Sequence, residues 1–385
     1  MTRKSRIVLI VVLILILLGA GILLWLNMVY GFIRTPGWLG GVVTQTVQTG
    51  SEQVSQQAGE QTSQEQMVAS FLNGVQIPQS RAGLPVLAVM VENSPPARPQ
   101  SGLSRADIVY ETLAEGGITR FMAFFQSQEA EILGPVRSVR IYFAKLAREY
   151  DAWIAHVGGS SDALAFINRH DLHDLDQFFI DKPYWRDATR MKTRGLEHSM
   201  YTDTNELRKL MTTTLPADFA PWSFATQEPP LEARPKSQHV TVNFSFPAFE
   251  VEWTYDRLAN DYVRSMASVL HKEAQDGKEL RAKDVLIQYV KMDAAFNKAK
   301  QDYSAEDIQL DGQGDGVLFK DGQEFPVTWT KSGDGVHTMY SDVQGAPVLF
   351  NPGLIWIELA AKDMVIYDDA VPDSDPSSQV LVKPL

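Results

Sequence analysis

The chain has 385 residues, of which 44% are hydrophobic and 21% are charged, a composition typical of a folded protein and not of a disordered one. Its formal net charge of −12 argues against a general nucleic-acid binder, because such proteins usually carry a basic surface. The chain contains no cysteine, which excludes disulfide bonds, thiolate metal ligands, a cysteine nucleophile and a lipid-modified cysteine.

Residues 7–26 form an apolar segment, IVLIVVLILILLGAGILLWL, without a charged side chain. A helix of that length measures about 30 Å, the thickness of the hydrocarbon core of a bilayer. Arg3, Lys4 and Arg6 precede it and should stay in the cytoplasm, which places the rest of the chain outside. A cleaved signal peptide is the alternative, but its apolar core is normally about 7–15 residues long. We expect a single uncleaved transmembrane helix that anchors an extracytoplasmic protein in the cell membrane.

Residues 31–80 are predicted to be a flexible linker. Their centre, 44–66, is rich in glutamine and contains no lysine, arginine or aromatic residue. Such a segment cannot bury enough apolar surface to offset the entropy lost on folding.

The region 81–222 alternates strand and helix patterns, which predicts an α/β domain. An apolar strand at 84–92 is followed by a hairpin at 106–126, whose turn is Gly116-Gly117. The spacing of apolar residues predicts a helix at 138–151 with Ser138 as its N-cap. A short strand at 152–157 then leads through two glycines into a second helix, capped by Ser160 or Ser161.

The region 239–367 follows a proline-rich boundary at 221–238 and is dominated by alternating strand patterns. Turn signals separate several of these strands, at Asp276-Gly277, Asp321-Gly322 and Asp334-Gly335. We expect a mostly antiparallel β domain, in which Trp329 and Trp356 belong to the core.

The order of several motifs resembles the YerB-like family of bacterial envelope lipoproteins. The motifs are PVLAVMVEN, ARPQSGLSRADIVYETLAEGGITRF, GPVRSVRIYF, AHVGGSSDA, GVLFKDGQEFPVTWTK and GAPVLFNPGLIWIEL, and they cover about 84–359. The resemblance implies a two-domain extracytoplasmic protein of unknown activity, with no catalytic residues to carry over. Members are commonly lipoproteins, whereas this chain has no cysteine, so its anchor would be the helix at 7–26.

Arginine usage is the strongest local signal for a binding site, because every basic residue between 81 and 140 is an arginine. The planar guanidinium can form bidentate hydrogen bonds with a carboxylate or a phosphate. The candidate ligand contacts are Arg98, Arg105, Arg120, Arg137 and Arg140. The alternative is internal pairing with the nearby acids Glu92, Asp107, Glu111 and Glu115.

The turn Gly158-Gly159-Ser160 is the second candidate, since a strand that ends in glycines before a helix can bind an anion through backbone N–H groups. A serine hydrolase is disfavoured there because the G-x-S-x-G pattern is absent. His170 and His173 have a spacing that could place both rings on one helical face, but they lack the H-E-x-x-H pattern, and we expect no metal site and no cofactor.

These observations favour a binding or scaffolding module of the cell envelope over an enzyme, and no catalytic residue is assigned. Its expected ligand is an anionic group on a cell-wall polymer, or an envelope protein, and not a nucleic acid. An enzyme acting on a phosphorylated envelope glycopolymer is the alternative, and it requires several of the candidate arginines and an acid such as Asp107 or Glu115 to meet in one cleft.

The topology predicts that a protease added to intact cells degrades most of the chain, because the regions after residue 26 lie outside the membrane. Immunoblotting against the C-terminal region measures this, with a cytoplasmic protein as the control for intact cells. Degradation only after lysis would contradict the topology.

Overall fold

A computed structural model describes residues 65–215, 219, 222–297 and 302–371 of the chain. The predicted membrane span and residues 31–64 of the predicted linker lie outside them. Across the described ranges, no helix is long and apolar enough to cross a bilayer. The last part of the predicted linker is folded: β1 (Met67–Ala69) pairs antiparallel with β2 (Gln76–Pro78), and Leu72 between them is fully buried.

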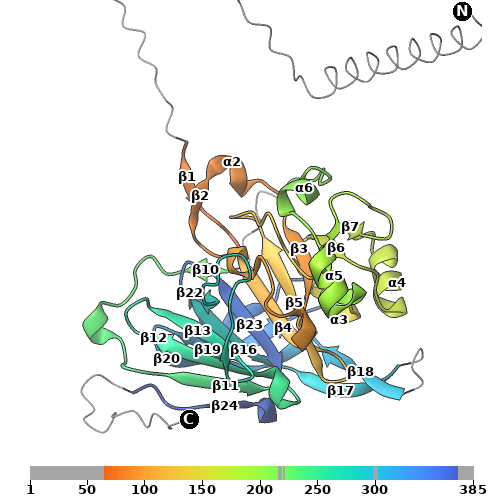
Figure 1. The fold of residues 1–385 in the computed structure, drawn as a ribbon. Coiled ribbons are helices and arrows are strands. Elements are labelled where there is room, and N and C mark those ends of the chain that lie inside the picture. The colour runs from red at the N-terminus through yellow and green to blue at the C-terminus, as the bar shows by residue number, and fades with distance from the viewer. Residues whose placement is uncertain (1–64, 216–218, 220–221, 298–301, 372–385) are drawn as a thin grey trace, which may run out of the picture. The chain divides into compact units, whose positions relative to one another are not determined.

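Strands from both sequence regions pair in one central sheet (Figure 1). Within the described residues it contains 12 strands, and its main path is β21-β20-β19-β16-β23-β4-β5-β3-β6-β7. The two regions meet where β23 pairs parallel with β4, with Ile355 opposite Ile108. The regions 81–222 and 239–367 therefore share the central sheet.

The strands of the first region have the bounds β3 Leu87–Glu92, β4 Ile108–Glu115, β5 Ile118–Phe125, β6 Trp153–His156, β7 Asp174–Asp176, β8 Trp185–Arg186 and β9 Met200–Tyr201. Those of the later region that join the central sheet are β16 Asp284–Tyr289, β17 Lys291–Asn297, β18 Asp302–Gln309, β19 Gly312–Lys320, β20 Gln323–Lys331, β21 Met339–Ser341 and β23 Ile355–Ala360. A short parallel pair joins β10 Ser223–Phe224 to β22 Leu349–Phe350.

A second, antiparallel sheet is built from the later region in the order β14-β13-β12-β11-β24, with β15 beside β13. The bounds are β11 His239–Asn243, β12 Glu250–Asp256, β13 Asp261–Met266, β14 Val269–Leu270, β15 Arg281–Ala282 and β24 Val365–Tyr367. The β-rich character expected for this region is confirmed.

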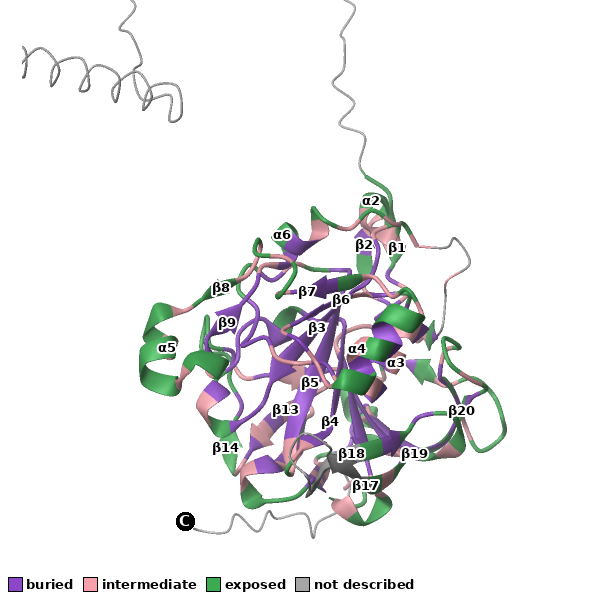
Figure 2. Ribbon diagram, turned by 90° about the vertical axis from the view of Figure 1, so that its right-hand side faces the viewer, coloured by how far each residue is buried: buried purple, intermediate pink, exposed green. Residues whose placement is uncertain are grey.

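Each face of the central sheet packs in a hydrophobic core. Successive side chains of a strand point to opposite faces, so neighbouring residues of β3 belong to different cores. Ala88 and Met90 pack in one core with the helices α3 (Ile141–Glu149) and α4 (Ser161–Arg169). Val89 and Val91 pack in another core with the second sheet. Figure 2 shows β3 as buried and part of α4 as exposed.

Burial explains why some strands are apolar throughout and others alternate between apolar and polar residues. Every residue of β3 and of β23 is buried, and both strands read as nearly continuous apolar runs. In β13 of the second sheet, buried and partly buried residues alternate strictly, as expected for a strand with one face toward solvent.

Helix α3 begins later than the sequence suggests. Its N-cap position is Arg140, not Ser138, because Ser138 belongs to an extended segment whose carbonyl accepts a hydrogen bond from Arg120. The other α-helices among the described residues are α2 Gln79–Ala82, α5 Ala188–Arg194 and α6 Thr204–Arg208.

Two predicted turns have the backbone that their residues favour. Gly116 and Gly117 join β4 to β5 with φ values of 58° and 76°. Asp321 and Gly322 join β19 to β20, also with positive φ, and a Cβ on Gly322 would lie 2.3 Å from the Tyr255 ring. Glycine is therefore required at 322 by both conformation and space.

Arg264 on β13 is fully buried between the two sheets. Its guanidinium donates to Glu111 on β4 and contacts His271. Its Cζ atom lies 4.7 Å from the ring centroid of Trp356 and 5.4 Å from that of Phe121, so aromatic faces also stabilise the cation.

A second buried carboxyl lies beside this pair. Glu358 on β23 is in register with Glu111, and Trp253 Nε1 donates to Glu358 Oε1 at 2.9 Å. Burial, and after it the neighbouring Glu111, raises the pKa of Glu358 well above its usual value, although Arg264 opposes the shift. A protonated Glu358 leaves one carboxylate facing one guanidinium.

Replacing Arg264 by methionine should lower the free energy of unfolding by about 3–5 kcal/mol, because the buried Glu111 carboxylate loses its charge partner. Urea denaturation measures the change. The double variant Arg264→Met/Glu111→Gln should recover part of the loss, and the exposed Arg169→Met is the control. Equal stability of the Arg264 and Arg169 variants would contradict the role of this pair.

Candidate functional site

A cavity of about 540 Å³ opens where strand β6 ends and the chain turns into helix α4. It brings together three of the residues selected from the sequence: Arg137, Gly158 and Gly159. The other lining residues are Val136, Ser138, Val157, Leu164, Asp176, Phe178, Phe179, Arg186, Leu196, Glu197 and Met200. We call this space the arginine cavity.

The glycine turn at the cavity is fixed by side chains of the protein itself. His156 Nδ1 lies 2.8 Å from the Gly158 carbonyl oxygen, and Nε2 lies 2.9 Å from Asp174 Oδ1. Asp176 Oδ1 accepts from the Gly158 amide at 2.9 Å and from the Phe178 amide at 3.1 Å. The Gly158 amide, which the sequence suggested for an external anion, is thus already bonded within the protein.

Ser160 occupies the N-cap position of α4, as the sequence suggested. Its side chain makes no capping bond, and among the described residues its buried Oγ atom has no hydrogen-bond partner. Ser160 is not among the residues that line the arginine cavity.

Arg137 is held in place by its backbone, because its amide donates to Met90 on β3 and its carbonyl accepts from Val157. Its Nε atom lies 3.5 Å from Glu92 Oε1, and this buried nitrogen has no hydrogen-bond partner among the described residues. Glu92 also binds His198 Nδ1, at 2.9 Å. Nε thus faces Glu92 inside the protein, whereas the Arg137 side chain as a whole is 30% exposed and lines the cavity.

Arg186, on β8, is the second arginine of the cavity and was not selected from the sequence. One of its terminal nitrogens, Nη1, donates to the Leu196 carbonyl at 2.6 Å and lies 3.4 Å from Ser199 Oγ. The only sequence signal for this residue is an arginine beside Trp185 in an irregular segment, which does not point to a site.

Arg98 and Arg105 lie outside the arginine cavity. Arg98 donates to the Asn93 carbonyl at 2.8 Å and lies over the ring of Phe249. Burial lowers the pKa of Arg98 to about 10. Arg105 is exposed and donates to Gln128 Oε1 at 3.0 Å.

Arg120 and Arg140 also have partners within the protein. Arg120 donates to the Ser138 carbonyl at 2.7 Å, and burial, followed by the charge of Arg140, lowers its pKa to about 9. Arg140 forms an ion pair with Glu115. Of the candidate acids, Glu92 thus lies near Arg137 and Glu115 pairs with Arg140, whereas Glu111 pairs with Arg264.

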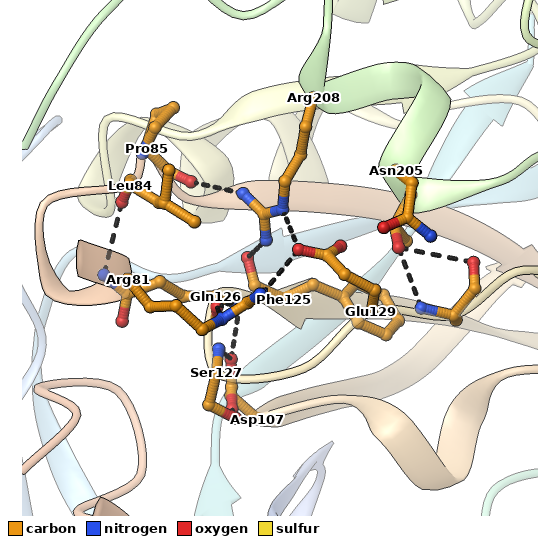
Figure 3. A network of polar contacts seen from close by, with 12 residues as sticks. Arg81, Leu84, Pro85, Asp107, Phe125, Gln126, Ser127, Glu129, Asn205 and Arg208 are labelled. Carbon is orange, nitrogen blue, oxygen red and sulfur yellow. Dashed lines mark hydrogen bonds and ion pairs between the residues drawn. The ribbon is translucent and has the colours of Figure 1, made fainter. Parts of the chain in front are cut away.

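Asp107 is fully buried in a network that ties the start of β4 to the end of β5 (Figure 3). Its carboxylate accepts from Asn73 Nδ2 at 2.6 Å, from the Gln126 amide at 2.5 Å and from the Ser127 amide at 2.9 Å. Burial raises its pKa to about 6, against the hydrogen bonds that lower it. Asp107 is therefore a structural carboxyl and not a cavity group.

The histidines at 170 and 173 pack against aromatic rings. His173 stacks on Trp153 with ring centroids 4.7 Å apart, and His170 lies 4.3 Å from the Phe166 ring. In the portion of the chain that the structure describes, no group of three or more His, Asp or Glu residues is arranged to hold a metal ion.

Comparisons with known proteins agree with the resemblance seen in the motifs. Two family models match, "Protein of unknown function (DUF3048) N-terminal domain" at 72–217 and the corresponding C-terminal domain at 240–357. The chain is 33% identical over 315 residues to a protein of Bacillus subtilis (strain 168) named "Putative lipoprotein YerB", covering 80% of this chain and 87% of that protein. The crystal structure of YerB from Bacillus subtilis is similar with a TM-score of 0.67 and 30% identity, covering 78% of this chain and 100% of that one.

The raised pKa of Asp107 predicts a pH-dependent loss of stability. The folded protein holds a proton on this carboxyl that the unfolded chain releases, so the free energy of unfolding falls as pH rises from 3.8 to about 6. A shift of this size corresponds to about 3 kcal/mol. Asp107→Asn should remove this component of the pH dependence. It should also be less stable at pH 7, because its NH2 group must face N–H donors in either orientation, at Asn73 Nδ2 or at the Gln126 and Ser127 amides.

Denaturation of the wild type and Asp107→Asn between pH 4 and 7 checks this prediction, with the exposed Glu131→Gln as the matched control. Parallel stability curves for the wild type and Asp107→Asn would contradict it.

Proposed function

This chain belongs to the DUF3048 family of YerB-like proteins, and we propose that it is a membrane-anchored extracytoplasmic protein that binds an anionic ligand in the arginine cavity. One observation carries the proposal: Arg137 and Arg186, from distant parts of the chain, line the same cavity. An anionic component of the cell envelope is the expected ligand class.

The donor capacity of the two arginines supports an anionic ligand. A guanidinium carries five N–H donors, and the Arg137 side chain is 30% exposed where it lines the cavity, although its Nε atom faces Glu92. Arg186 uses Nη1 within the protein, at the Leu196 carbonyl. A phosphate or carboxylate would supply the missing acceptors and form charge-assisted hydrogen bonds.

The two acids that line the cavity do not cancel this preference. Asp176 is nearly fully buried, and its carboxylate accepts from the backbone amides of Gly158 and Phe178. Glu197 lies 3.6 Å from His198 Nε2, and its side chain is 61% exposed. Segment 177–199 is basic within an acidic chain; its charged residues are Lys182, Arg186, Arg190, Lys192 and Arg194 against Asp181, Asp187 and Glu197.

We favour binding over turnover because the alternative, an enzyme acting on a phosphorylated glycopolymer, required several arginines and an acid to meet in one cleft. Arg98, Arg120 and Arg140 do not line the arginine cavity, and their guanidinium groups bind backbone carbonyls or Glu115. Asp107 and Glu115 do not line it either.

The membrane anchor in this proposal is the apolar segment 7–26. The similar protein from Bacillus subtilis is named a lipoprotein, whereas this chain has no cysteine to carry a lipid. A transmembrane helix would retain the same placement at the outer face of the cell membrane.

Equilibrium dialysis of the full chain in detergent against radiolabelled inorganic phosphate tests the binding site. Arg137→Gln and Arg186→Gln should each weaken binding at least tenfold, because each removes a charged donor from the cavity. Arg105→Gln, a change at an exposed arginine outside the cavity, should leave binding unchanged. Thermal unfolding of each variant checks that the fold is retained. The proposal fails if phosphate does not bind, or if the cavity variants bind it as well as the control does.

A further inference from the structure

The arginine cavity has an apolar wall that an inorganic anion would not use. Phe178 and Phe179 line it and are 70% and 85% exposed, and Leu196 is 56% exposed. Exposed apolar side chains gathered at a cavity are typical of a ligand or partner site.

The two phenylalanines are held in this exposed position by the fold. The Phe178 amide donates to the Asp176 carboxylate, and the Phe179 amide donates to the Asp176 carbonyl at 3.0 Å. The Phe178 ring also covers the glycine turn, since a Cβ on Gly158 would lie 2.8 Å from its Cε2 atom. Their exposure is therefore built into the turn.

A second cavity of about 390 Å³ adjoins the first one along helix α4 and shares Leu164 and Phe179 with it. Ile167 and Leu172 add further apolar surface. Its charged lining residues are Asp171 and Asp174, and no basic side chain lines it. It would repel an anionic group but can accept an apolar one.

We propose that the ligand is an anionic amphiphile, a phosphate monoester of an apolar chain. The inference rests on the proposed function and specifies its ligand. The phosphate group of the ligand lies at Arg137 and Arg186. Its apolar chain passes over Phe178 and Phe179 toward the second cavity. The distribution of charge sets this direction, because the arginines line the first cavity and the acids Asp171 and Asp174 line the second.

A series of phosphate monoesters tests the contribution of the apolar chain. The full chain in phosphatidylcholine nanodiscs is dialysed against ethyl, butyl and hexyl phosphate, with empty nanodiscs as the blank. Glucose 6-phosphate carries the same phosphate monoester on a polar sugar, and 1-hexanol carries the same alkyl chain without the phosphate. Affinity should rise with chain length, and hexyl phosphate should bind at least tenfold more tightly than glucose 6-phosphate and 1-hexanol, since about two buried methylene groups account for a tenfold gain.

Phenylalanine variants test where the alkyl chain of the ligand lies. Phe178→Ala and Phe179→Ala should reduce the advantage of hexyl phosphate over glucose 6-phosphate without changing the affinity for glucose 6-phosphate. Phe246→Ala is the matched control, because Phe246 is 58% exposed and its ring likewise covers a glycine with positive φ, Gly117, away from the cavity. This control should keep the full advantage.

The outcomes separate the inference from the proposed function. Equal affinities for hexyl phosphate and glucose 6-phosphate, both dependent on Arg137 and Arg186, would overturn the amphiphile and leave anion binding intact. Binding of 1-hexanol as tight as that of hexyl phosphate would also overturn the inference. Absence of binding by every phosphate would overturn both proposals.

A further arm identifies the source of the amphiphile. Nanodiscs that contain phosphatidic acid present the same monoester head within a bilayer. Loss of hexyl phosphate binding in these nanodiscs would support the inference with a membrane lipid as the source. Unchanged binding would support it with a freely diffusing ester.

Discussion

The buried pairing of Arg264 with Glu111 is the constraint on which the architecture depends. A guanidinium without exposure to water must be matched by a charge and by aromatic faces, and here these come from strands of both sheets. Glu111 belongs to the first sequence region, whereas Arg264 and Trp356 belong to the later one. The pairing therefore fixes how the second sheet lies on the central sheet.

Polar contacts link this pair to the arginine cavity. His271 contacts Arg264 and lies 2.7 Å from Gln100 Oε1, and Gln100 Nε2 donates to the Glu92 carbonyl at 2.9 Å. The Glu92 carboxylate in turn faces Arg137 at the cavity wall. The cavity arginine is thus positioned by the same network that joins the two sheets, and its backbone amide is bonded to Met90 of β3.

Local patterns predicted much of the fold and little of the site. The strands, the Gly116-Gly117 turn and the position of Ser160 follow from spacing and turn chemistry, which act over a few residues. The pairing of β4 with β23 joins residues about 250 positions apart, and no local pattern encodes it. Arg186 was missed for the same reason, because only the tertiary fold brings it into the same cavity as Arg137. Charge alone also could not show that Glu111 would pair with Arg264, since closer arginines were available in the sequence.

The place of β23 in the sheet has a consequence for how the chain is made. This strand lies between β16 and β4 and is the only one of the described strands that bonds to both. During synthesis, the edge of β4 that pairs with β23 therefore stays unpaired at Ile108–Glu111 until residues 355–360 have emerged. Nascent chains with such an edge are prone to aggregate. The central sheet can therefore close only after almost the whole chain has been synthesised.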